Sequence, residues 1–208
     1  MTVLNIVTAA AIISVAGAYA QVPTDPYNPQ SRRVAVTTVE PSLADMGFGT
    51  DEGNVGPFVT NTDKQYAQAM MVRGMMEIRL GQAAVEKSER ADVKALAQRL
   101  IGEYLKWDDG MQKAAVKLGI PVPSDMDGKQ KAEVERISAL SGPAFDQAYL
   151  KEVIHLQQKA LTMSNHEASN ASVSGFRHYA GVVLPTIQDQ IATAQRALDA
   201  DGTTISRK

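Results

Sequence analysis

The stretch that decides the fold is Tyr66–Val85, which reads YAQAMMVRGMMEIRLGQAAV. At about 100° per residue, four of its side chains lie within roughly 60° of one another on an α-helix: Met70, Gly74, Glu77 and Gly81. A carboxylate therefore stands in the middle of the face that should turn inward, with a glycine one turn to either side. Glu77 is consequently a candidate ligand or a member of a buried hydrogen-bond network.

The composition is that of a helical protein without thiol chemistry. The chain has 208 residues and a net charge of −2, with no long run of one sign, so it offers no electrostatic footprint for nucleic acid or for a polybasic membrane contact. It contains no cysteine, which excludes disulfides, thiolate metal sites and a cysteine nucleophile. After Thr62 the chain is rich in Ala, Leu, Met, Gln, Lys and Glu, all of which favour helix.

The first 61 residues predict an export signal followed by an extension. Residues 6–15 form an apolar run, and Ala18-Tyr19-Ala20 is the small-residue pattern of a signal-peptidase site, so we expect residues 1–20 to be a signal peptide. The apolar run is short for a membrane span, and residues 1–5 lack the usual Lys or Arg. Residues 21–61 are rich in Pro, Thr, Ser and Asn without a period, which predicts a flexible extension.

From residue 62 onwards, apolar side chains repeat every three or four positions. The expected helices are 62–87, 91–119, 129–140, 143–168 and 172–200, followed by a tail at 201–208. Asn61, Thr62 or Asp63 should provide the first N-cap. Four long helices joined by short turns predict an all-α fold, an antiparallel four-helix bundle over residues 62–200, with one short extra helix between the second and third long helices.

Five motifs in order are similar to those of one known family. They are GMMEIRLG at 74–81, VKALAQRL at 93–100, LGIPVP at 118–123, LSG with FDQAY at 140–149 and LPT at 184–186. Together they resemble the domain-of-unknown-function 4142 family over residues 58–198. The resemblance implies an exported bacterial protein of ferritin-like architecture, a type sometimes labelled a putative outer-membrane protein.

The family pattern also implies inward histidines that this chain replaces. Where the family carries Asp-His, this chain has Glu103-Tyr104 and Leu156-Gln157, and where the family carries His it has Gln190. Ferritin-like metal centres use Glu and His from facing helices, and Tyr and Gln are poorer ligands than imidazole for first-row divalent metals. We therefore expect no metal site and no cofactor.

Four polar residues could meet at one level of the bundle: Glu77, Tyr104, Gln157 and Gln190. One interpretation is a buried network in which Tyr104 and the amides donate to the Glu77 carboxylate. A second is a residual ligand-binding or metal cluster, and a third is that Glu77 reaches water through a gap left by the flanking glycines. All three stay open at this point.

Two other groups could suggest metals, and in both the plainer interpretation is favoured. The four methionines of the first helix could bind copper, but methionine also fills gaps in helical cores; Met70 lies on the inner stripe, Met71 and Met75 border it, and Met76 faces away. Glu152 and His155 form a single Glu-x-x-His element, whereas the di-iron pattern requires two.

The sequence favours an exported, non-enzymatic helical bundle in the periplasm or cell envelope, acting through its surface or its extension. The alternative is a metal- or small-ligand-binding bundle centred on Glu77. No nucleic-acid partner is expected, and no transmembrane segment after signal removal. An envelope protein or a second copy of the chain could be its partner.

Overall fold

The computed structural model describes residues 58–205, with side chains to residue 200. This part of the chain contains five α-helices and no strand: α1 Asn61–Lys87, α2 Ala91–Lys117, α3 Gly128–Ser138, α4 Gly142–Asn170 and α5 Ser174–Ile205. The predicted all-α fold is confirmed. The predicted signal peptide and nearly all of the predicted extension lie outside the described residues. The last helix continues past its predicted end at residue 200.

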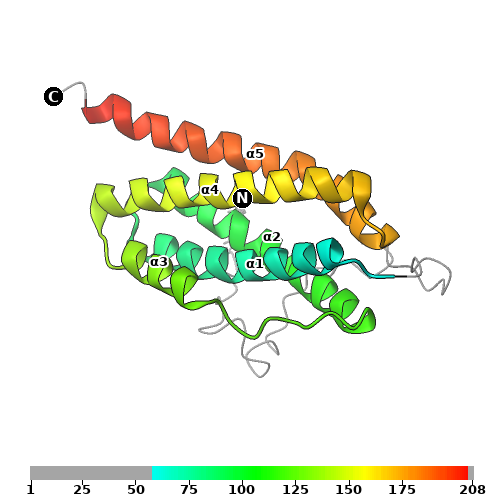
Figure 1. Ribbon diagram of the computed structural model, residues 1–208. Helices are drawn as coiled ribbons and strands as arrows, with labels where there is room; N and C mark the ends of the chain where they lie inside the picture. The colour runs from blue at the N-terminus through cyan, green and yellow to red at the C-terminus, as the bar shows by residue number, and fades with distance from the viewer. Residues whose placement is uncertain (1–57, 206–208) are drawn as a thin grey trace, which may run out of the picture.

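The four long helices pack in two hairpins (Figure 1). Residues 88–90 join α1 to α2, and residues 171–173 join α4 to α5. The hairpins meet where α1 contacts α4 and where α2 contacts α5, while the short α3 lies against both α1 and α4. The helix α3 therefore flanks the interface between α1 and α4. The connection at 118–127 leads the chain from the end of α2 back to this interface. None of the described helices is both long and apolar enough to cross a membrane.

The start of α1 is set by a capping box that ties two parts of the chain together. Thr60 is the N-cap: its hydroxyl accepts a hydrogen bond from the Asp63 amide at 3.1 Å, and the Asp63 carboxylate accepts one from the Thr60 amide at 2.7 Å. The predicted N-cap at residues 61–63 is therefore wrong by one position, because Asp63 serves as the third helical residue of the box. The other Asp63 oxygen accepts from the Ser172 amide at 3.0 Å, which holds the α4–α5 turn against the start of α1.

The methionines of α1 pack into the core. All four are at most 5% exposed: Met70, Met71, Met75 and Met76. The expectation that Met76 faces away is wrong, because α3 and the segment before it supply the apolar side chains of the same cluster, among them Met126, Val134 and Ile137. Their burial among apolar residues is what the packing interpretation predicts.

Gly81, one turn after Glu77, allows α1 and α2 to pack closely and leaves no path from Glu77 to water. A Cβ added at Gly81 would lie 2.9 Å from Ile101 Cγ1 of α2, so the missing side chain lets α1 and α2 approach. Glu77 itself is 2% exposed. The interpretation in which Glu77 reaches water is therefore wrong.

Candidate functional site: a polar network beneath a surface pocket

Three of the four predicted site residues meet inside the protein. Glu77 lies on α1, Tyr104 on α2 and Gln157 on α4, and each is less than 9% exposed. The Gln157 amide Nε2 donates to the Tyr104 hydroxyl at 2.9 Å and lies 3.4 Å from Glu77 Oε2. Because unpaired buried polar groups are costly, these contacts make Gln157 the link between the three helices.

Gln190 belongs to a different cluster. It is 3% exposed on α5, and its amide donates to the Glu103 carboxylate of α2. Arg99 binds the same carboxylate at 3.0 Å and Asp189 at 2.5 Å. The expectation that Gln190 would meet Glu77 is thus corrected: Glu103, which directly precedes Tyr104, faces α5 and takes the amide instead.

Sequence reasoning missed the residue that connects the network to the surface. Arg73 stands one turn before Glu77 on α1 and is partly buried. Its Nη1 donates to Gln157 Oε1 at 2.7 Å, and its guanidinium carbon lies 4.8 Å from the centre of the Tyr104 ring, within the range of a cation–π contact. The i, i+4 spacing of Arg73 and Glu77 was the available signal.

The guanidinium of Arg73 has no direct counter-ion among the residues that the structure describes. Among the described side chains, no carboxylate forms an ion pair with it, and its Nε is buried without a hydrogen-bond partner. Burial opposes its charge, but Tyr104 and Glu77 lie close enough to raise the pKa of Arg73 above its usual value. Arg73 therefore remains a cation held by a neutral amide and an aromatic face.

Glu77 is protonated in a large part of the molecules near neutral pH, because its pKa is close to 7. Burial raises the pKa of Glu77 to about 7, although the charge of Arg73 and the hydroxyl of Tyr104 pull it down. Its Oε1 has no hydrogen-bond partner, and neither has the buried hydroxyl of Tyr149, whose pKa is raised by burial and by the charge of Glu77. A protonated Glu77 leaves the positive charge of Arg73 uncompensated.

The residues around Glu77 do not fit a ferritin-like metal centre. Such a centre needs several carboxylates and imidazoles converging on one point, whereas Glu77 is surrounded by a guanidinium, a phenol and an amide. Within the part of the chain with described side chains, no group of three or more His, Asp or Glu residues could hold a metal ion. A cation beside Glu77 would also be repelled by Arg73.

A buried pair of carboxyl groups lies at the start of α1. Glu167 on α4 is 1% exposed and hydrogen-bonds to Asp63. Burial raises the pKa of Glu167 to about 7, and the neighbouring Asp63 adds to this. Burial also acts against the charge of Asp63, but its hydrogen bonds to Thr60, Glu167 and Ser172 lower the pKa of Asp63 below its usual value. Glu167 therefore tends to keep its proton at mildly acidic pH while Asp63 is ionised, and Asp63 fastens the α4–α5 turn through the Ser172 amide.

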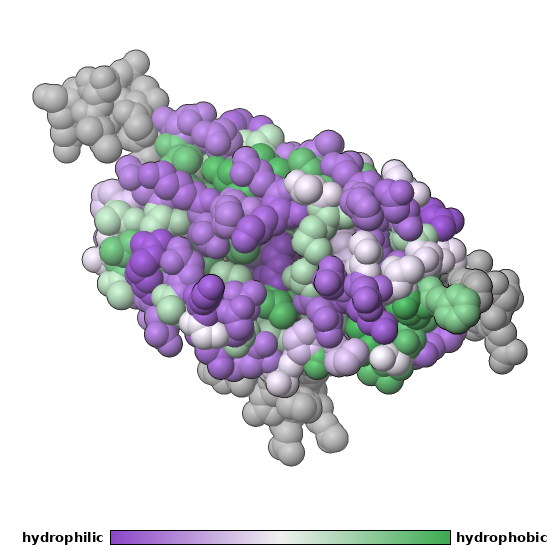
Figure 2. Space-filling model, viewed as in Figure 1, coloured by the Kyte–Doolittle hydropathy of each residue, from purple (hydrophilic) through white to green (hydrophobic). Residues whose placement is uncertain are grey.

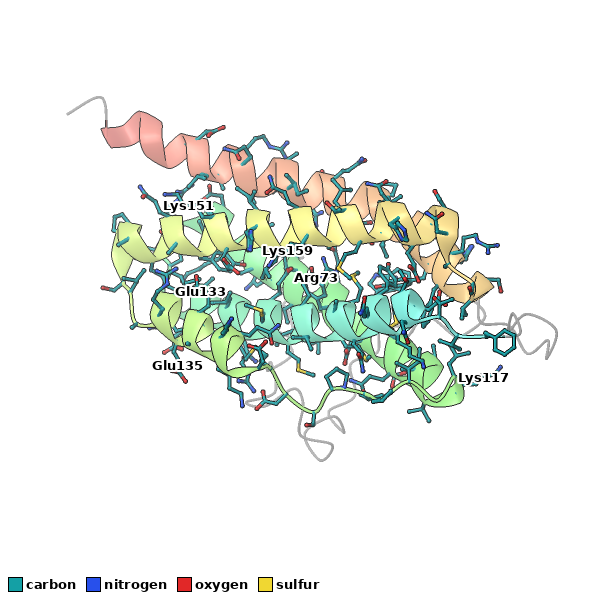
Figure 3. All side chains as sticks on the ribbon, in the orientation of Figure 1. Arg73, Lys117, Glu133, Glu135, Lys151 and Lys159 are labelled. Carbon is teal, nitrogen blue, oxygen red and sulfur yellow. The ribbon has the colours of Figure 1, made fainter. Side chains whose placement is uncertain are left out.

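A pocket of about 520 Å³ opens between α1, α3 and α4. Of the network residues, Arg73 alone lines it. Figure 2 shows this face hollowed at its centre, with a hydrophilic base. In Figure 3, Arg73 and Lys159 lie between α1 and α4, and Glu133 lies on the side of α3 that faces them. The pocket therefore reaches the network through Arg73, with Glu77 behind it.

The pocket wall combines apolar side chains with a few charges. Its apolar part includes Met70, Met76, Leu156, Ala160 and Met163. Its charged part includes Arg73, Lys129 and Lys159, with Glu133 and Glu152 at other points of the lining. This mixture is typical of small-molecule sites, in which apolar walls supply contact area and a few polar groups fix orientation.

Comparison with known proteins places the chain in a family. A family model described as a domain of unknown function (DUF4142) matches residues 52–197. The chain belongs to the DUF4142 family. The predicted membership is thereby confirmed, and the matched range contains both the buried network and every residue of the pocket wall. No curated protein matches the chain at a significant level.

A solved structure shares the helical fold of this DUF4142 protein. The crystal structure of a DUF305 fragment from Deinococcus radiodurans matches with a TM-score of 0.62 and 19% sequence identity. The match covers 69% of this chain and 99% of the fragment. At this identity, the likeness concerns the arrangement of helices alone.

Proposed function

We propose that this DUF4142 protein is an exported, non-enzymatic binding protein of the cell envelope that holds a small molecule in the α1/α3/α4 pocket. Its scaffold is an antiparallel four-helix bundle of ferritin-like type, with α3 added beside it. The observation that carries the proposal is a pocket of about 520 Å³ whose base is an arginine held by a buried network. The ligand contact thereby moves from Glu77, which does not line the pocket, to Arg73.

The size and the construction of the pocket support binding. Its volume falls within the range of about 300–1,000 Å³ that is usual for small-molecule sites. The side chain of Arg73 is held in place by the Gln157 hydrogen bond and by the face of the Tyr104 ring. A group fixed in this way loses little rotamer freedom when a ligand arrives, so more of the contact energy appears as affinity.

The chemistry of the wall supports binding rather than catalysis. The described wall contains one imidazole, His155, but no hydroxyl or thiol nucleophile that it could activate. One of its two carboxylates, Glu133, is held by Arg136 of the same helix at 2.6 Å. Glu77, the acid whose pKa of about 7 would suit proton transfer, lies behind Arg73 and out of reach of a ligand.

Export is supported by the first 20 residues alone. Expression of the full chain in a bacterial host, followed by osmotic-shock fractionation and mass spectrometry of the intact protein, tests it. We expect the periplasmic fraction to contain a chain that begins at Gln21. Recovery in the cytoplasmic fraction with Met1 or Thr2 at the N-terminus would refute export.

Two fluorescent probes test the pocket: the neutral phenylnaphthylamine and the anionic anilinonaphthalene sulfonate. Both fluoresce when they enter an apolar site, and we expect saturable binding of at least one. Ala69→Trp fills the wall of the pocket, whereas Ala95→Trp adds the same bulk on an exposed part of α2. Binding lost in the first variant and kept in the second supports the proposal. If neither probe binds, or if the two variants bind a probe equally well, the proposal is refuted.

A further inference from the structure

We propose that the ligand of the α1/α3/α4 pocket is a small organic acid, a carboxylate that meets Arg73 and carries an apolar body along the methionine-lined wall. This inference rests on the proposed function, because it names the class of molecule that the pocket accepts. In this view Arg73 recognises the acid, and Gln157 and Tyr104 hold the Arg73 side chain in position.

The first step is the unmet bonding capacity of Arg73. A guanidinium carries five N–H donors and suits a carboxylate bound by two parallel hydrogen bonds. Here one donor is taken by Gln157, the Nε is buried without a partner, and no described carboxylate forms an ion pair with the group. A cation that is partly withdrawn from water and has no direct counter-ion is costly. An acid entering the pocket would supply both the missing charge and the missing acceptors.

The second step is the balance of charge around the pocket. Lys159 and Lys129 stand on the α4 and α3 sides and add positive charge, while Glu133 is neutralised by Arg136. Glu152 is the remaining acid of the wall, and burial raises its pKa above the usual value. The wall is therefore positive towards an entering anion.

The third step is the apolar surface beside Arg73. Met70 and Met76 lie one turn before and about one turn after Arg73 on α1, and Leu156 and Met163 face them from α4. Methionine side chains adapt to ligands of different shape. A molecule with an acid group at one end and a short apolar body therefore matches the pocket better than a small polar anion does.

Calorimetric titration of the full chain with octanoate and with octanamide tests the inference. The two probes share the apolar body and differ in charge. We expect octanoate to bind and octanamide to bind at least about tenfold more weakly, which is the effect of losing one charged hydrogen-bonded contact. Inorganic phosphate, added in excess, should not displace octanoate. Equal affinity of octanoate and octanamide, or displacement by phosphate, overturns the assignment of a carboxylate.

Variants locate the contact. Arg73→Gln should weaken octanoate binding about tenfold or more and leave octanamide binding unchanged, whereas Lys117→Gln, at the far end of α2 (Figure 3), should change neither. Unchanged octanoate affinity in Arg73→Gln overturns the inference. If that variant does not fold, Lys159→Gln decides. Weaker octanoate binding there supports the inference when Lys151→Gln, on α4 but outside the lining of the pocket, changes nothing; equal affinity of the two variants refutes it.

The test separates this inference from the proposed function. If octanoate and octanamide bind equally and Ala69→Trp blocks both, the pocket binds small molecules but does not select acids, so the inference fails alone. If neither molecule binds and neither fluorescent probe binds, both proposals fail together.

Discussion

Replacing Glu77 by glutamine should make the protein more stable at mildly alkaline pH and remove the part of its pH dependence that Glu77 causes. Glu77 is 2% exposed, and burial raises its pKa to about 7 from an ordinary value of 4.5. The folded chain therefore holds the Glu77 proton more tightly than the unfolded chain does. Between these two pKa values the folded state binds more protons, so the free energy of unfolding falls as the pH rises through this window.

The size of the effect follows from the shift. A difference from 4.5 to about 7 corresponds to roughly 3 kcal/mol, at about 1.4 kcal/mol per pH unit. Glutamine resembles the protonated carboxyl in shape and remains neutral at every pH. Near pH 4 the wild type and Glu77→Gln should therefore have similar free energies of unfolding. Near pH 8 the variant should be more stable by up to roughly 3 kcal/mol.

Urea unfolding followed by circular dichroism measures the difference at both pH values. The change with pH in the gap between wild type and variant isolates Glu77, because the other titrating groups are present in both proteins. Glu86→Gln is the matched control, since Glu86 is exposed on the same helix. We expect the gap between wild type and Glu86→Gln to change little with pH.

Two results would refute the reasoning. If Glu77→Gln is less stable than wild type near pH 8, the carboxylate is stabilised by Arg73 more than burial destabilises it. If the gap between wild type and variant is the same near pH 4 and near pH 8, Glu77 has no raised pKa in the folded protein. Either outcome would also weaken the view that Arg73 lacks a counter-ion.

Three further predictions concern other parts of the fold and can be checked by urea unfolding. Glu167→Gln should also flatten the fall in stability between pH 4.5 and about 7, because burial raises the pKa of Glu167 to about 7; an unchanged pH profile would contradict the carboxyl pair. Gly81→Ala should destabilise the protein by about 1 kcal/mol, since its Cβ would lie 2.9 Å from Ile101 Cγ1 and the cost of overpacking outweighs the gain in helix propensity. Gly102→Ala, which meets nothing within 4 Å, should instead stabilise it by about 1 kcal/mol, and equal effects of the two alanines would remove the packing argument. Thr60→Ala should lower the free energy of unfolding by about 1 kcal/mol because the capping box is lost. In this variant the amides in the first turn of α1 should exchange their hydrogens faster than in the wild type.

Most of the helix boundaries could be predicted because their causes are local. The period of the apolar side chains and the polar turns place α1 and α2 within about two residues of their observed ends. The end of α5 was missed, because the polar composition after residue 200 does not by itself stop a helix that is already formed. The N-cap was missed by one position because Thr60 and Asp63 act as a pair, and a search for a single capping residue does not find pairs.

Part of the candidate site could also be predicted, because local periodicity shows which side chains face inward. Glu77 and Tyr104 stand in the middle of their helix faces, so periodicity alone places both in the interior. Gln190 also faces inward, but its partner depends on which helix stands opposite. Arg73 lies beside the inner stripe, and only the length of its side chain carries the guanidinium over the Tyr104 ring. Helical periodicity predicts the direction in which a side chain leaves the helix, but it does not predict where the terminal group of a long side chain lies.

The sequence by itself determined the helices, the inward position of Glu77 and the family, because each depends on residues close together in the chain. Only the tertiary structure decided that Gln157 joins Arg73 to Tyr104, and that Glu77 lies behind Arg73. The pocket likewise exists because α3 returns beside α1 and α4 and leaves a space between the three helices. Such a space depends on how far apart packed helices stand, and no pattern within a single helix records that distance.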